Sequence, residues 1–105
     1  MNEDSDLTVL MSSYLNIDFK YTDPDPWEVV RVFARTEGVD IVANAVVEAQ
    51  GLLSRHLGDD DLDKVLSREH GLGYVPRLGG YSTNDWLTQV ADLLDRMVRQ
   101  RRAGN

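Results

Sequence analysis

Apolar residues recur at intervals of three or four along most of the chain, a spacing that predicts amphipathic helices almost throughout. The longest apolar stretch covers residues 40–57 and predicts a central helix with a broad buried face. Its apolar positions are Ile41, Val42, Ala45, Val46, Ala49, Leu52, Leu53 and Leu57. A clean apolar stripe over residues 83–100 consists of Trp86, Leu87, Val90, Leu93, Leu94, Met97 and Val98. A core built from helices is therefore expected.

Four of the predicted helices, including the last one, begin with residues that cap helices well. The candidates are Ser5 or Asp6 for residues 5–15, Asp25 with Pro26 and Glu28 for the helix that ends at Gly38, the aspartates 59–61 for residues 59–69, and Ser82 with Asp85 for the last helix. Arginines 96, 99, 101 and 102 suit the negative end of the last helix dipole. This gives five predicted helices.

Glycines are expected to separate these helices. Gly38 and Gly58 each follow a helical pattern, and Gly38 is predicted to end its helix in a left-handed conformation. Gly51 lies inside the central helix, where glycine costs about 1 kcal/mol relative to alanine. Its presence there indicates a place where another helix approaches closely.

Two segments are predicted to be ordered loops that are anchored by aromatic residues. Residues 16–24 alternate apolar and polar side chains but have no second strand to pair with, and residues 70–81 contain four glycines and a proline. Trp27, Phe33 and Trp86 fall on apolar helical faces and are expected in the core. The loop tyrosines Tyr21, Tyr74 and Tyr81 suit either a protein interface or packing against that core. The predicted fold is an all-α single domain over residues 1–105.

Composition narrows the class of protein further. The chain has 105 residues and no cysteine, which excludes disulfides and thiolate chemistry. No apolar run reaches the ~18 residues of a membrane span. The first six residues are acidic and polar, unlike a secretory signal. We therefore expect a cytoplasmic protein that does not bind membranes.

The charge is strongly asymmetric. The chain carries a net charge of −7, and residues 1–63 contain fourteen acidic against four basic residues. Such a surface repels phosphate, so nucleic acid is not an expected partner. It attracts a basic protein and raises the rate of association, although a solvated acidic surface that serves only solubility fits the charge as well.

The number and spacing of the relevant residues exclude the common calcium, dinucleotide and zinc motifs. A calcium loop that begins at Asp59 needs glycine at its sixth position and glutamate at its twelfth, which are Lys64 and His70 here. The glycines near Tyr74 lack the third glycine of a dinucleotide fingerprint, and His56 and His70 are too few and too far apart for a zinc site. No metal, cofactor or catalytic residue is therefore expected.

Two stretches carry a resemblance to a known family. The first runs Tyr14-Leu15-Asn16-Ile17-Asp18-Phe19 and continues at Asp25-Pro26-Trp27-Glu28-Val29-Val30, and the second is Gly73-Tyr74-Val75-Pro76 with Ser82, Trp86 and Leu87 after it. Over residues 12–98 the chain resembles the immunity proteins of bacterial contact-dependent growth inhibition (CDI) systems, the CdiI-type domain family. The resemblance implies a cytoplasmic binding protein, not an enzyme, that neutralises a cognate toxin C-terminal domain, often a nuclease.

The resemblance transfers no list of contact residues, so the candidates come from charge and aromatic character. An acidic domain can cover the basic active site of a nuclease. The expected toxin-binding residues are Asp18, Tyr21, Asp23, Asp59, Asp60, Asp61, Asp63 and Tyr74, on a chain that is a monomer before toxin binding. Two other classes stay open: an acidic interaction adaptor without a toxin partner, and a small enzyme that uses His70 with Asp85 or Glu69.

Overall fold

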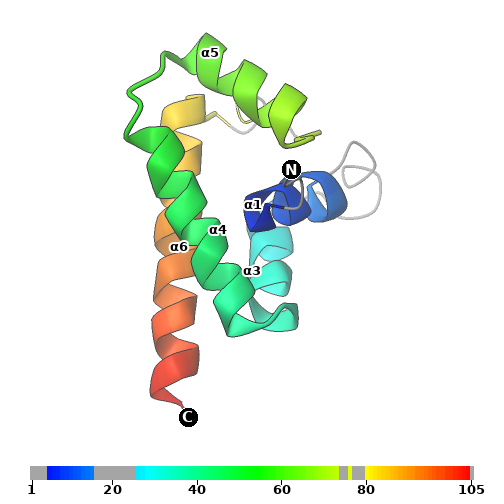
Figure 1. Ribbon diagram of the computed structural model, residues 1–105, viewed down its shortest axis with the longest axis vertical. Helices are drawn as coiled ribbons and strands as arrows, with labels where there is room; N and C mark the ends of the chain where they lie inside the picture. The colour runs from blue at the N-terminus through cyan, green and yellow to red at the C-terminus, as the bar shows by residue number, and fades with distance from the viewer. Residues whose placement is uncertain (1–4, 16–25, 74–75, 77–79, 105) are drawn as a thin grey trace.

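The computed structural model describes residues 5–15, 26–73, 76 and 80–104. The elements in chain order are α1 (Asp6–Thr8), η1 (Val9–Tyr14), α3 (Pro26–Thr36), α4 (Val39–Leu53), α5 (Asp59–Lys64), η2 (Val65–Glu69) and α6 (Thr83–Ala103) (Figure 1). The π-helical turns η1 and η2 continue α1 and α5 directly, so the described residues form five helical segments. The described residues contain no strand, and the predicted all-α class is confirmed.

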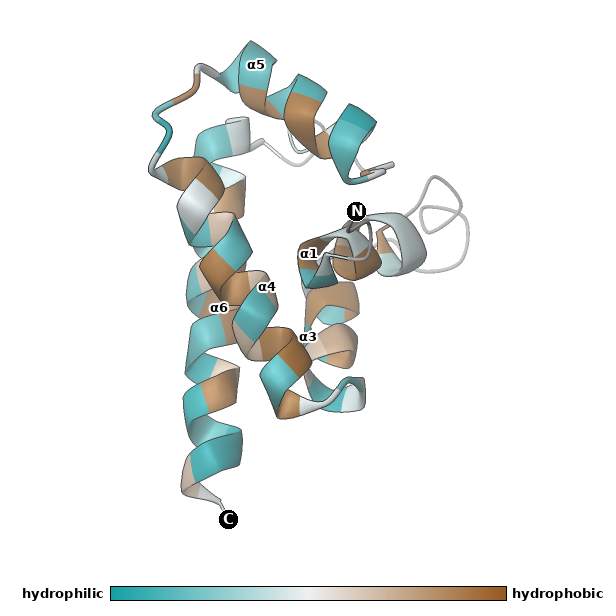
Figure 2. Cartoon of the chain, in the orientation of Figure 1, coloured by the Kyte–Doolittle hydropathy of each residue, from teal (hydrophilic) through white to brown (hydrophobic). Residues whose placement is uncertain are grey.

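The core lies where α4 and α6 run antiparallel and α1 and α3 pack against them (Figure 1). The predicted central helix is confirmed, because α4 contacts α1, α3 and α6. Trp86 and Phe33 are fully buried, as predicted, whereas Trp27 is only partly buried. Figure 2 shows hydrophobic residues on the sides of the helices that face one another.

The predicted serine caps are confirmed, whereas the aspartate cap predicted for residues 59–69 is wrong, because Gly58 is the N-cap of α5 and Asp59, Asp60 and Asp61 lie in its first turn. The hydroxyl oxygen of Ser82 accepts the Asp85 N–H at 3.1 Å, and Ser5 does the same for Thr8 at 3.1 Å. Pro26 is the first residue of α3, while its predicted cap, Asp25, lies outside the described residues.

Arg101 caps a different helix from the one expected. Its Nη1 donates to the carbonyl oxygens of Ala34 at 2.7 Å and Glu37 at 2.6 Å, at the end of α3. The terminal carbonyls of a helix need partners, and here a neighbouring helix supplies the donor. Arg101 therefore fastens the C-terminal end of α6 to α3.

Gly38 and Gly58 lie between helices, as predicted, but the left-handed conformation predicted for Gly38 is wrong. Gly38 and Gly58 have φ values of −59° and −66°, and they are the N-caps of α4 and α5. The central helix ends at Leu53, earlier than expected, and His56 takes the left-handed conformation instead with φ of 56°. The turn at residues 54–56 and the extended glycine after it together redirect the chain into α5.

Gly51 does not mark a close helix approach. A Cβ atom built on this exposed residue of α4 meets nothing within 4 Å. Gly51→Ala is therefore expected to raise the free energy of unfolding by about 0.5–1 kcal/mol, because alanine restricts the unfolded chain more than glycine does. Urea unfolding followed by circular dichroism measures the change.

Gly71→Ala is the matched control for this prediction and is expected to lower the free energy of unfolding. Gly71 has φ of +76°, and an added Cβ would lie 2.8 Å from the Cβ of Ser12. The same substitution therefore strains the backbone and forces Ser12 to move. Equal effects of the two substitutions would contradict this account of the two glycines.

Candidate functional site

The aspartates of α5 divide into two pairs with different surroundings. Asp59 Oδ1 accepts hydrogen bonds from the backbone N–H of Asn84 at 3.0 Å and from its side-chain amide at 2.8 Å. The carboxylate of Asp63 accepts the hydroxyl hydrogen of Thr83, which is fully buried. Asp59 and Asp63 therefore fasten α5 to the first turn of α6, where the helix dipole also favours negative charge.

The other pair faces solvent. Asp60 and Asp61 are exposed, and Figure 2 shows hydrophilic residues along the outer side of α5. The remaining predicted contact residues, Asp18, Tyr21, Asp23 and Tyr74, lie outside the described residues. Among the predicted contact residues that the structure describes, Asp60 and Asp61 form the exposed acidic edge of α5.

Several other acidic side chains hold the fold together. Glu48 on α4 accepts the N–H of Leu7 at 3.0 Å, at the start of α1. Glu37 accepts the hydroxyl hydrogen of Tyr14 at 2.6 Å, and this hydrogen bond is the main reason why the pKa of Tyr14 rises to about 12. Part of the acidic excess of residues 1–63 thus serves internal contacts rather than an outer surface.

His70 links the end of η2 to the N-terminal helix. Its Nδ1 lies 2.8 Å from the hydroxyl oxygen of Thr8, and that oxygen lies 2.8 Å from the hydroxyl oxygen of Ser5. Burial lowers the pKa of His70, while the charges of Glu48 and Glu69 act in the opposite direction. The imidazole has a structural use in this chain of hydrogen bonds.

The lowered pKa of His70 predicts a loss of stability in acid. The unfolded state binds a proton more readily than the folded state, so this contribution is present above the ordinary pKa of 6.5 and is lost as the pH falls below it. Between about pH 7 and pH 5 the melting temperature is expected to fall more for the natural chain than for His70→Gln. Parallel pH profiles by circular dichroism would contradict the assignment.

A groove that sequence analysis did not predict lies between α3 and α6. It has a volume of about 210 Å³ and is lined by Trp27, Arg31, Gln89, Asp92, Leu93 and Arg96. Beside it the ring of Trp27 packs edge-on against Tyr81, with ring centroids 5.6 Å apart, and the indole N–H donates to the Tyr81 hydroxyl oxygen at 3.3 Å. Trp27 and Tyr81 are 54 positions apart in the chain, so only the folded arrangement brings them together.

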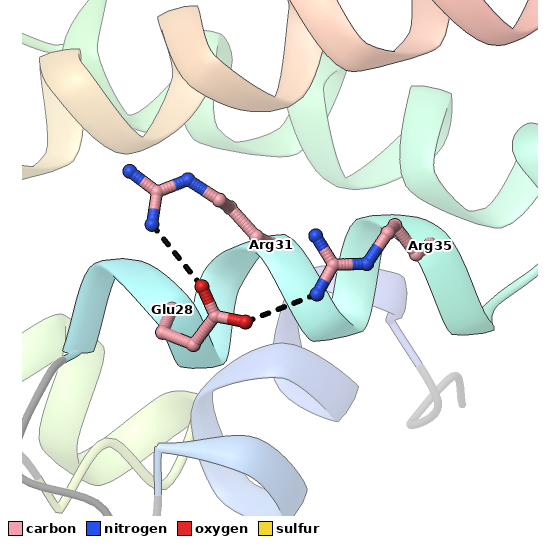
Figure 3. A network of polar contacts seen from close by, with 3 residues as sticks. All are labelled: Glu28, Arg31 and Arg35. Carbon is pink, nitrogen blue, oxygen red and sulfur yellow. Dashed lines mark hydrogen bonds and ion pairs between the residues drawn. The ribbon is translucent and has the colours of Figure 1, made fainter.

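Arginines border this groove on both helices. On α3 the two carboxylate oxygens of Glu28 bind different arginines, Arg31 at 3.3 Å and Arg35 at 3.0 Å (Figure 3). On α6, Arg96 pairs with Asp92 at 3.3 Å. The group on α3 has two arginines for one glutamate and so keeps a net charge of +1, although the chain as a whole is acidic.

Within the described ranges, no group of three or more His, Cys, Asp or Glu side chains could hold a metal ion. None of the helices in the described part of the chain is both long enough and apolar enough to cross a membrane.

Comparison with known proteins identifies the family. A crystal structure of a CdiA-CT/CdiI complex from Y. kristensenii contains a chain with the same fold, with a TM-score of 0.78 and 23% sequence identity over 86% of this chain and 91% of that chain. No curated protein matches the sequence significantly. The model of the CdiI immunity protein family matches residues 5–94, which include every helical segment except the end of α6. The chain therefore belongs to the CdiI immunity protein family.

Proposed function

We propose that the protein binds and neutralises the C-terminal domain of a cognate CDI toxin. The observation that carries this proposal is the family match over residues 5–94, which spans most of the chain. The related fold in a CdiA-CT/CdiI complex supports it, because that immunity protein is seen together with a toxin domain. The protein acts by occupying a surface, in the cytoplasm, as a monomer before it meets the toxin and without a cofactor or catalysis of its own.

The toxin domain is a nuclease, and the immunity protein covers its basic active site. A nuclease site must hold phosphate and is therefore electropositive, so an acidic domain has the complementary charge. Asp60 and Asp61 support this role because they are exposed on α5. Asp18, Asp23, Tyr21 and Tyr74 complete the proposed contact, with the tyrosines as aromatic anchors.

The two inward-facing aspartates of α5 contribute in a different way. Asp59 and Asp63 bind Asn84 and Thr83, so they set the position of α5 on α6. Their carboxylates also add to the negative potential that a basic partner meets at this end of the molecule. Asp59 and Asp63 thereby keep the exposed pair in a fixed place on the surface.

Co-expression with a candidate cognate toxin domain, chosen from a CDI toxin gene found adjacent to this one, tests the proposal. A tagged toxin domain is expected to retain the immunity protein through affinity and size-exclusion steps, and cells that express both are expected to grow. An unrelated toxin domain of the CDI type serves as the control and is expected to kill cells despite the immunity protein. Retention of a housekeeping protein with no protection from the toxin would favour the adaptor class instead.

A further inference from the structure

We propose that the groove between α3 and α6 is a second contact surface for the same toxin domain, and that it receives an acidic side chain. This inference rests on the proposed function. It assigns to the toxin a carboxylate beside an apolar residue, so that the two surfaces of the immunity protein recognise opposite charges.

The groove has the size and lining of a site for one or two side chains. Its volume of about 210 Å³ is smaller than the ~300–1,000 Å³ of pockets that bind small molecules or cofactors. Trp27 and Leu93 supply an apolar surface, and Arg31 and Arg96 supply charge from the two sides. Tryptophan and arginine are the residue types that most often dominate binding energy at protein interfaces.

The arginines can bind a carboxylate while they keep their internal partners. A guanidinium group has five N–H donors, and the ion pairs described above use one nitrogen each of Arg31 and Arg96. Their side chains are 42% and 63% exposed, so the donors are accessible. Both oxygens of Glu28 are already bound by arginines, which favours an incoming anion over an incoming cation here.

The opposite sign of the two surfaces has a consequence for specificity. A uniformly acidic protein would be attracted to any basic protein in any orientation. An acid-binding groove on α3 and α6, together with the exposed aspartates on α5, fixes one orientation and rejects partners that lack a matching acid. The groove therefore contributes more to the lifetime of the complex than to the rate of encounter.

Paired substitutions on α6 test the groove against a matched position. Arg96→Gln is expected to raise the dissociation rate constant roughly tenfold. Arg99→Gln is the control, because Arg99 forms the same kind of ion pair, with Asp95 at 3.0 Å, and does not line the groove. Surface plasmon resonance with the immobilised toxin domain gives both rate constants, and thermal melting checks that the two variants are equally stable.

Asp92→Asn tests whether the toxin side chain in the groove is negatively charged. Asp92 lines the groove and repels an acidic side chain, so its neutralisation is expected to slow dissociation, whereas Asp95→Asn is expected to leave it unchanged. Faster dissociation of the Asp92→Asn variant would overturn the acidic assignment. If the complex forms and Arg96→Gln and Arg99→Gln have equal dissociation rate constants, the groove does not contact the toxin domain. The proposed function is unaffected by that result. A natural chain that does not bind the toxin domain would overturn both.

Discussion

Trp86→Ala is expected to lower the free energy of unfolding by about 3–5 kcal/mol, the usual cost of removing a large buried aromatic side chain. Trp86 is fully buried in α6, one turn after the Ser82 cap. Its loss leaves a cavity at the start of the helix that α4, α3 and α5 all contact. Since domains of this size are stable by only about 5–15 kcal/mol, the variant is expected to be marginally folded at 37 °C.

Val47→Ala provides the comparison for this stability effect. The side chain of Val47 is 64% exposed on α4, so its truncation is expected to change stability by less than about 0.5 kcal/mol. Chemical denaturation of both variants measures the difference. A small effect for Trp86→Ala, similar to that of Val47→Ala, would contradict the packing described for the core.

The double variant Asp60→Lys/Asp61→Lys is expected to slow association with the toxin domain by about tenfold or more at low salt. Both residues are exposed, and reversal of two charges turns attraction of a basic site into repulsion. The effect is expected to shrink at high salt, because the screening length falls from about 10 Å at 0.1 M to about 3 Å at 1 M. Stopped-flow association rates over a salt series measure both features.

Asp40→Lys/Asp95→Lys changes the net charge equally at sites away from α5. Asp40 is 93% exposed at the start of α4, and Asp95 lies in the second half of α6. This variant is expected to bind nearly as fast as the natural chain. If both double variants slow association alike, the effect comes from net charge and the α5 contact is wrong. Asp59 is left unchanged in the test because its carboxylate holds Asn84 and its reversal would disturb the fold.

The helices were predictable because their signals are local. The spacing of apolar residues and the capping serines depend on neighbours within a few positions, and α5 with η2 covers the predicted residues 59–69. The boundary after α4 was not predictable in the same way. A glycine can either end one helix or begin the next, and the left-handed residue between α4 and α5 proved to be His56.

For the candidate site, only the negative charge was predictable from the sequence. The sequence contains a run of aspartates at 59–61 and 63, but nothing local indicates that Asp59 and Asp63 bind Asn84 and Thr83, about twenty to twenty-five positions away. The groove between α3 and α6 depends on contacts over longer separations still. Trp27 was predicted in the core, and its partial exposure beside Arg31 and Arg96 follows from helix packing that no local pattern encodes.

Titration of the toxin domain with the purified protein tests most directly whether it neutralises by binding alone. The activity of a fixed amount of toxin domain, which is nuclease activity under the proposed function, is measured as increasing amounts of immunity protein are added. The account predicts a linear fall that reaches zero at one immunity protein per toxin domain, with active toxin recovered after the complex is separated under denaturing conditions and refolded. Inactivation of many toxin molecules by one immunity protein, or full activity at an excess of it, would contradict the account.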